Sequence, residues 1–192
     1  MQPSSPFTTL LATDLVAFGA QYRDIATQVQ VRHNMYARVI EALTFAGVSW
    51  PHCHHEDRGD GTFIVTPPEA HPAVFLDPML NHLSAAVGRH NRCVGPPGRM
   101  RLRVAVHHGP VHYDGYGVTG PDTLLLFRLL EAPRFKRKVH ASGSELAAIV
   151  SDTLYTNAFD RNTLINPAAY RATRLTHKET RRVRAWLWFP PQ

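Results

Sequence analysis

The alternation of apolar and polar positions predicts a series of short strands along the chain. By this pattern we expect strands at residues 7–13, 52–58, 62–66, 100–107, 111–113, 148–150, 170–175 and 182–189. Leu102, Val104 and Val106 are expected to share one face of their strand, because successive side chains of a strand point to opposite faces. A turn is expected at residues 108–110, where His-Gly-Pro follows that strand.

Apolar residues that recur every three or four positions predict helices between these strands. The longest is expected at residues 22–45, to end near Gly47, and to bury a stripe made of Ile25, Val29, Tyr36, Ile40 and Leu43. A second is expected at residues 74–90, with a buried face made of Phe75, Met79, Leu83 and Val87. Shorter helical segments are expected at residues 124–130, 144–147 and 152–159. The order of elements predicts an α+β fold, in which helices pack on a face of one mixed sheet.

Composition indicates one globular domain. Of the 192 residues, 44% are hydrophobic and 19% are charged, and we expect a flexible leader at residues 1–6 and a single domain at residues 7–192. No run of about 18 apolar residues predicts a membrane span, and the first residues lack the basic and apolar regions of a signal peptide. Cys53 and Cys93 alone predict no disulfide framework, so we expect a cytoplasmic protein.

The chain is basic, with a formal net charge of +6, which favours an anionic partner. Much of the excess lies in residues 134–138 and 171–184. Both a nucleoside triphosphate and nucleic acid are anionic, but the sequence lacks the interleaved basic and aromatic residues of a single-strand platform. Nucleic acid is therefore not favoured, and a solvated basic face is the alternative that needs no partner.

Two aspartates at strand ends are candidate ligands for a divalent cation. Asp60 lies in the sequence Gly-Asp-Gly, which is typical of a hairpin turn, and Asp14 follows the first predicted strand. Because Mg²⁺ prefers carboxylate and phosphate oxygens, the pair predicts a two-metal phosphoryl-transfer site. The simpler alternative is that each aspartate only forms a turn or a cap. Residues 52–55, His-Cys-His-His, lack a second ligand pair at zinc spacing, so zinc is not expected.

Five short motifs follow one another along the chain. They are Asp14-Leu-Val-Ala-Phe18, Gly59-Asp60, Arg103-Val-Ala-Val-His-His-Gly-Pro-Val111, Gly120 with Arg128, and Lys178 within Thr-His-Lys-Glu. Their order and spacing resemble the catalytic domain of class III nucleotidyl cyclases, the adenylyl and guanylyl cyclase family, over roughly residues 7–189. The resemblance implies a ferredoxin-like, palm-type mixed sheet. No single motif is specific, so the resemblance rests on all five together.

The resemblance implies a metal site and a phosphate site. In the family, two aspartates bind two Mg²⁺ or Mn²⁺ ions per site, and the matching residues here are Asp14 and Asp60, with the Leu15 carbonyl as a further ligand. The triphosphate would be held by backbone amides at an expected helix start, those of Val16, Ala17, Phe18 and Gly19.

The resemblance also implies a head-to-tail homodimer. Arg128 would stabilise the charge that develops on the α-phosphate, and Lys178 would bind the terminal phosphates. In the family these two residues come from one copy and the metal ligands from the other, so a monomer is expected to be inactive.

The base-reading positions implied by the resemblance slightly favour guanine. Glu56 falls where the family has a base reader, and a carboxylate accepts hydrogen bonds from guanine but donates none to adenine N1. The second reading position falls near Gly117, which has no side chain, so a pyrimidine triphosphate is an alternative. Leu124 stands where the family has an Asn that orients the ribose, and Ala17 stands where the family usually has Gly.

The implied function is a nucleotidyl cyclase that converts a nucleoside triphosphate to a 3′,5′-cyclic nucleotide and pyrophosphate. Because Leu124 cannot hydrogen-bond to the ribose, the alternative is an inactive cyclase-like module that dimerises and senses a nucleotide or a partner. Such a cyclase would be constitutive, controlled by expression, or controlled by a separate regulatory or effector protein, and the sequence does not choose between these alternatives.

Overall fold

The computed structural model describes residues 6–159, 165–178 and 180–191. Most of the leader expected at residues 1–6 therefore lies outside the described residues. Pro6 is described, and its carbonyl accepts a hydrogen bond from the Val111 amide at 3.0 Å. Within the described ranges, none of the helices has both the length and the apolar character needed to cross a bilayer.

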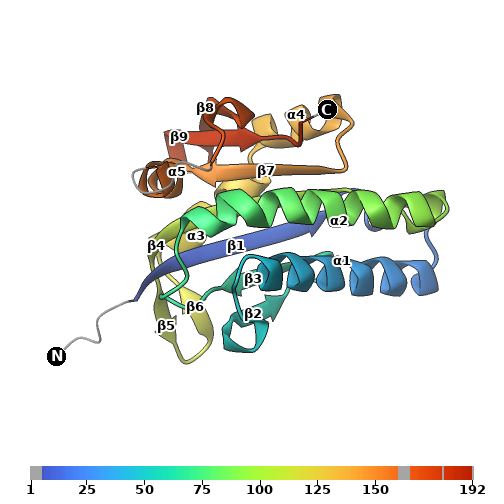
Figure 1. Ribbon diagram of the computed structural model, residues 1–192, viewed down its shortest axis with the longest axis horizontal. Coiled ribbons are helices and arrows are strands. Elements are labelled where there is room, and N and C mark those ends of the chain that lie inside the picture. The colour runs from blue at the N-terminus through green and yellow to red at the C-terminus, as the bar shows by residue number, and fades with distance from the viewer. Residues whose placement is uncertain (1–5, 160–164, 179, 192) are drawn as a thin grey trace.

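Seven strands form one mixed sheet in the order β2-β3-β1-β4-β7-β9-β8 (Figure 1). Neighbouring strands are antiparallel except for β4 and β7, which run parallel. A separate hairpin, β5–β6, follows β4. The strands are β1 (Phe7–Leu15), β2 (His54–Asp57), β3 (Gly61–Val65), β4 (Leu102–Pro110), β5 (His112–Asp114), β6 (Gly117–Thr119), β7 (Leu146–Ser151), β8 (Tyr170–His177) and β9 (Thr180–Trp188).

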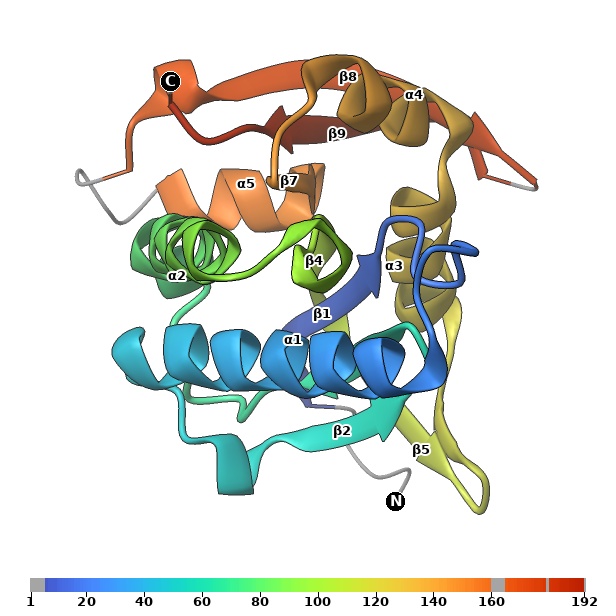
Figure 2. The same ribbon diagram turned by 90° about the vertical axis from the view of Figure 1, so that its right-hand side faces the viewer.

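Helices cover both faces of this sheet (Figures 1 and 2). Helices α1, α2 and α5 share one buried cluster with β1 and β4, and α3 and α4 share a second cluster on the opposite face. The helices are α1 (Ile25–Phe45), α2 (Leu80–Cys93), α3 (Pro121–Glu131), α4 (Pro133–Ser142) and α5 (Asp152–Phe159), with short helical turns at Trp50–His52, Phe75–Met79, Pro96–Gly98 and Pro167–Ala169.

The first half of the chain has the ferredoxin-like arrangement that was predicted. Its elements follow the order β1-α1-β2-β3-α2-β4, and the four strands lie side by side as β2-β3-β1-β4. The later strands extend this sheet on the β4 side. The α+β class with a mixed sheet and packed helices is thus confirmed.

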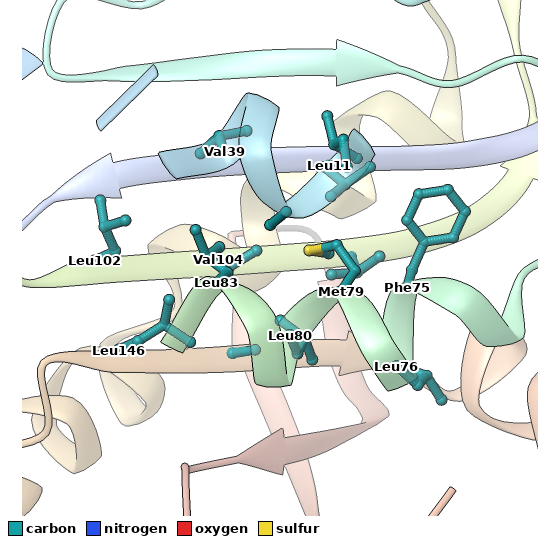
Figure 3. Packing of buried hydrophobic residues seen from close by; sticks show 14 of the residues in the cluster. Leu11, Val39, Phe75, Leu76, Met79, Leu80, Leu83, Leu102, Val104 and Leu146 are labelled. Atoms are coloured by element: carbon teal, nitrogen blue, oxygen red, sulfur yellow. The ribbon is translucent and has the colours of Figure 1, made fainter. Parts of the chain in front are cut away.

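The core beneath α1 and α2 is built from aliphatic side chains of the sheet and the helices (Figure 3). Leu83 of α2 lies next to Val104 of β4, Leu80 and Leu102 belong to the same cluster, and each of the four is at most 1% exposed. Val106 belongs to the same cluster, so the predicted shared face of β4 is confirmed. Removing this apolar surface from water is the main favourable contribution to folding.

The predicted buried stripe of α1 is largely wrong. Ile25 and Val29 are 78% and 62% exposed. The helix begins at Ile25 because the Asp24 carboxylate caps it, accepting a hydrogen bond from the Thr27 amide at 2.8 Å. A second stripe of equally helical spacing faces the sheet instead, comprising Val31, Met35, Val39, Ala42 and Leu43.

The turn predicted at residues 108–110 is also wrong. β4 continues to Pro110, because β1 runs antiparallel beside it as far as the Phe7–Pro110 pair and supplies hydrogen-bond partners. The return strand predicted at residues 111–113 does form, as β5, but it pairs with β6 rather than with β4.

Two helical predictions need correction. Residues 144–147 do not form a helical turn, because β7 begins at Leu146. The helix predicted at residues 74–90 is interrupted at Asp77, which precedes a proline and is extended at φ −150° and ψ 123°. Its predicted buried residues are nevertheless all buried, namely Phe75, Met79, Leu83 and Val87.

Helix α4 was not predicted from the sequence. Its charged residues 134–138 dominate the local composition, but Phe135 and Val139 lie four positions apart and are buried on one side. Both side chains belong to the buried cluster that also contains Ala147 and Ile149 of β7.

Candidate active site

Asp14 and Asp60 lie side by side at one end of the sheet. Asp14 is the penultimate residue of β1 and pairs in register with Gly61, the first residue of β3. The carbonyl of Asp60 accepts a hydrogen bond from the Leu15 amide at 2.8 Å. Asp60 is thus the turn residue directly before β3, its backbone lies beside the end of β1, and its charge raises the pKa of Asp14.

Gly61 makes this close approach sterically feasible. A Cβ atom at position 61 would lie 1.8 Å from the carbonyl oxygen of Thr13 and 3.0 Å from the Cα of Asp14. Both are backbone atoms of β1 and cannot move aside independently of the sheet. A residue with a side chain at position 61 would therefore separate β3 from β1 and move Asp60 away from Asp14.

Arg103 is a residue of this site that sequence reasoning did not select. It is the register partner of Asp14 on β4. Its Nε donates to Asp14 Oδ1 at 2.8 Å, and its Nη2 donates to the other oxygen in a short contact. Asp14 is 7% exposed, and burial raises its pKa to about 6 although Arg103 lowers it. At neutral pH the carboxylate is ionised and already paired.

The donor set at this end of the sheet suits a hard divalent cation. Asp14 and Asp60 supply carboxylate oxygens, and Leu15 supplies a backbone carbonyl at the end of β1. Within residues that the structure describes, no cluster of three or more His, Cys, Asp or Glu side chains is placed to hold a metal. An ion held by these groups would take its remaining ligands from phosphate oxygens or water, as is usual for Mg²⁺.

The predicted phosphate-binding residues 16–19 form a turn rather than a helix start. Helix α1 begins six residues later, at Ile25, so the helix dipole does not act on this turn. Ala17 adopts a left-handed conformation with φ 55°. The Val16 amide is used by the Arg101 carbonyl at 2.9 Å, whereas the amides of residues 17–19 make no hydrogen bond with any described residue.

Arg23 stabilises this turn through hydrogen bonds and was also not predicted from the sequence. It is buried, and its Nη1 donates to the Ala17 carbonyl at 2.9 Å. Its Nε and Nη2 donate to the carbonyls of Pro97 and Arg99 at 3.1 and 2.7 Å. A buried guanidinium that satisfies three carbonyls fixes the turn to the segment before β4.

Glu56 and Gly117, the two predicted base-reading positions, are neighbours in the structure. A Cβ atom at position 117 would lie 3.2 Å from Glu56 Oε1. The other carboxylate oxygen accepts from Arg58 Nη2 at 2.7 Å, and His54 Nε2 lies 3.2 Å from Oε1. The carboxylate is thus held on β2 by cationic and imidazole donors and faces the β5–β6 hairpin.

Arg128 lies on α3 and reaches β9. Its Nη1 donates to Thr180 Oγ1 at 3.1 Å. Leu124 precedes it by one helical turn and is 54% exposed, although it is a large apolar residue. Lys178 is exposed in the β8–β9 turn, where it has φ 52°. Arg128 and Lys178 therefore lie at the same end of β9.

Lys178 lies at the end of the sheet opposite to Asp14, whereas α3 extends toward Asp14, since the charge of Glu131, one turn after Arg128, raises the Asp14 pKa. Asp14 lies beside the first residues of β4, and β4 and β7 run parallel from their first residues. β7 and β9 are antiparallel, so the beginning of β7 lies beside the end of β9, near Trp188. Lys178 lies at the other end of β9, because it precedes the first residue of that strand. At about 3.3 Å per residue, the length of β9 separates the two ends by roughly 26 Å. The arrows of β1 and β9 accordingly point the same way (Figure 1).

A buried contact fixes the start of α3 to the sheet. His107 of β4 is 2% exposed, and its Nε2 lies 2.7 Å from Asp122 Oδ1. Burial lowers the pKa of His107, which Asp122 partly offsets. Gly109 gives room for this contact, because a Cβ there would lie 2.4 Å from Asp122 Oδ1.

No model of a known protein family and no curated protein matches the sequence. Solved structures match it over nearly its whole length. The adenylate/guanylate cyclase/hydrolase from Silicibacter pomeroyi is 19% identical, with a TM-score of 0.63 over 97% of this chain and 98% of that chain. The guanylate cyclase domain of RhGC from Catenaria anguillulae, solved with GTP, is 14% identical, with a TM-score of 0.63 over 98% and 99% of the two chains.

A third match is the catalytic core of a rhodopsin-guanylyl cyclase with converted specificity, in complex with ATPαS. It is 13% identical, with a TM-score of 0.65 over 97% of this chain and 96% of that chain. The chain therefore has the fold of class III nucleotidyl cyclase catalytic domains, as the sequence motifs predicted. At these identities the likeness concerns the fold.

Proposed function

We propose that the protein is a nucleotidyl cyclase, which converts a nucleoside triphosphate to a 3′,5′-cyclic nucleotide and pyrophosphate. The observation that carries the proposal is the juxtaposition of Asp14 and Asp60 at the end of a cyclase-type sheet, with Gly61 at their close approach. Mg²⁺ or Mn²⁺, two ions per site, would be held by these carboxylates and the Leu15 carbonyl. Such ions lower the pKa of the attacking hydroxyl and neutralise the triphosphate.

The chain's own residues position the triphosphate and its charge. The amides of Ala17, Phe18 and Gly19 have no other partner among the described residues and would donate to phosphate oxygens. Arg128 would stabilise charge on the α-phosphate, and Lys178 would bind the terminal phosphates. Arg103 donates to both oxygens of the Asp14 carboxylate, which favours the ionised form and fixes the side chain's orientation.

Guanine is the base that Glu56 fits best, with a pyrimidine as the alternative. The carboxylate accepts from guanine N1–H and N2–H₂. Arg58 and His54 hold it in place without blocking all of its lone pairs. Gly117 has no side chain that could contact the base. Discrimination between guanine and a pyrimidine would therefore rest mainly on Glu56 and on its hydrogen-bond partners Arg58 and His54.

The proposed active unit is a head-to-tail homodimer. Asp14 and Lys178 lie roughly 26 Å apart along the strands of one chain, too far to contact one triphosphate. An antiparallel second copy would bring the Asp14 end of one chain to the Lys178 end of the other. Each dimer would then contain two composite sites.

Leu124 supports a second candidate function, a dimeric nucleotide-sensing module without turnover. Its side chain is 54% exposed on the same side of α3 as Arg128 and cannot hydrogen-bond to a ribose. Without that positioning the reacting hydroxyl would be poorly aligned, and binding would persist while chemistry slowed.

Incubation with ATP, GTP, CTP and UTP in the presence of Mn²⁺, read by mass spectrometry, tests the proposal. We expect one cyclic nucleotide, most of it from GTP, and its loss in Asp60→Ala. Glu69→Gln is the matched control, because Glu69 is an exposed carboxylate outside the site. No cyclic product from any triphosphate, in a sample shown to be dimeric, would reject the enzyme and leave the sensing module.

A further inference from the structure

The turn between β2 and β3, residues 58–60, carries the candidate cation ligand Asp60. Gly59 has φ 80°, a left-handed conformation that glycine adopts readily. Main-chain hydrogen bonds close the turn. The Arg58 amide donates to the Gly61 carbonyl at 3.0 Å, and the Asp60 amide donates to the Arg58 carbonyl at 3.1 Å. These bonds fix the two ends of the turn but do not use the Gly59 amide.

Asp57, the last residue of β2, accepts the hydrogen bond of the Gly59 amide. The amide donates to Asp57 Oδ1 at 2.7 Å. A carboxylate that accepts from the amide two positions later restricts the conformation of a turn. Gly59 directly precedes Asp60, so the orientation of its backbone helps to determine where the Asp60 carboxylate points. Of the hydrogen bonds that close this turn, this is the one that depends on a side chain.

Helix α1 holds the Asp57 side chain in this position. β2 is an edge strand of the sheet and lies beside α1 (Figure 2). The second carboxylate oxygen of Asp57 pairs with Arg32 of α1, and the Arg32 guanidinium lies 5.7 Å from the centroid of the Tyr36 ring. The two paired side chains are 39% and 45% exposed, so the pair adds little to stability. Its effect is to orient the carboxylate whose other oxygen holds the turn.

We propose that Asp57 is a positioning residue for the cation ligand Asp60. The inference rests on the proposed function, which supplies the cation. Mg²⁺ requires oxygen ligands in a nearly ideal octahedral arrangement. A ligand on a loosely held turn would lose conformational freedom when the cation binds, and that loss would weaken binding. The charge of Asp60 raises the pKa of Asp14, so the turn already holds the two carboxylates within electrostatic reach of each other.

The affinity for Mn²⁺ alone, without nucleotide, tests this role. Electron paramagnetic resonance of the unbound ion measures it. Asp57→Ala is expected to weaken Mn²⁺ binding about tenfold, because the turn that carries Asp60 loses its side-chain hydrogen bond. Asp57→Asn keeps an oxygen that can accept from the Gly59 amide and loses only the charge. It should therefore bind Mn²⁺ within about threefold of the unaltered protein.

Asp114→Ala is the matched control. Asp114 Oδ1 accepts from the Tyr116 amide at 2.8 Å, which is the same contact over the same number of residues in the β5–β6 hairpin. That hairpin contains none of the candidate cation ligands. Both alanine variants are expected to lose a similar amount of stability in urea. Only Asp57→Ala should lose affinity for Mn²⁺, which a purely structural role would not predict.

Four results would overturn the inference. They are unchanged Mn²⁺ affinity in Asp57→Ala, an equal loss in Asp114→Ala, no recovery in Asp57→Asn, and no Mn²⁺ binding by the unaltered protein. With GTP present, the Mn²⁺ concentration that gives half-maximal activity should rise about tenfold in Asp57→Ala. Product formation without that rise would reject this role of Asp57 and leave the proposed function standing. If no triphosphate gives a product, the proposed function fails, and the Mn²⁺ affinities alone decide on Asp57.

Discussion

Gly61 stands where β1 and β3 approach most closely, and its missing side chain lets Asp60 lie beside Asp14. The nearest atoms are backbone atoms, so a methyl group at this position cannot be accommodated by a rotamer change. The geometry of the proposed metal site therefore depends on one glycine as much as on the two carboxylates.

We expect Gly61→Ala to lower the free energy of unfolding by at least about 3 kcal/mol, because the new Cβ would overlap the Thr13 carbonyl. Gly115→Ala is the control, since a Cβ there would have no neighbour within 4 Å. It should change stability by less than about 0.5 kcal/mol. Urea unfolding followed by circular dichroism measures both, and equal effects at the two positions would contradict the account.

His107 is predicted to make stability depend on pH. Burial holds its pKa below the usual value, so the unfolded chain binds protons before the folded one as the pH falls through about 6.5. The free energy of unfolding should therefore decrease on the acid side of this pH. In His107→Leu the decrease should be shallower, and in His140→Leu, at an exposed position, it should persist. Identical pH profiles for the protein and both variants would be evidence against this role.

At the residue scale, the sequence was sufficient to predict the candidate metal-binding carboxylates but not the arginines that position the site. Asp14 and Asp60 were predicted because an acidic residue at a strand end is visible in the sequence. Arg103 and Arg23 were missed because their role depends on strand register and on a distant loop. Arg103 lay inside a recognised motif, and its position opposite Asp14 would have followed from pairing β1 with β4.

At the scale of elements, α1 shows why periodicity alone was insufficient. Two apolar stripes share one helix, and only contact with the sheet decides which is buried. By contrast, α5 was predicted with its observed bounds, Asp152–Phe159, since an acidic residue begins it and apolar residues follow. β4 was predicted too short because Gly and Pro were interpreted as a turn, whereas β1 stabilises them in a strand.

The stripe assignment on α1 leads to a direct prediction. Met35 is 0% exposed, so Met35→Ala should lower the free energy of unfolding by about 2–4 kcal/mol. Ile25→Ala removes a similar apolar volume from a side chain that is 78% exposed and should cost less than about 0.5 kcal/mol. Chemical denaturation of both variants decides between the two stripes, and a larger cost at Ile25 would show that the sequence-based assignment was right.

At the scale of the whole molecule, the fold could be predicted from the sequence. The separation of the predicted site residues to opposite ends of the sheet could not be predicted from residue patterns alone. The order of elements indicated an α+β sheet, and the motifs indicated a cyclase-type domain. That Asp14 and Lys178 lie at opposite ends of one sheet follows only from the register of four strands. This separation is the physical reason why the proposed active site needs two copies of the chain.

The measurement that tests this account most directly is activity after mixing two inactive variants, Asp60→Ala and Arg128→Gln. If sites are shared between copies, a mixed dimer contains one intact site, because each chain supplies what the other lacks. An equimolar mixture should then regain about one quarter of the unaltered activity. If the mixture stays as inactive as its components while the unaltered protein is active, the two-copy site is contradicted.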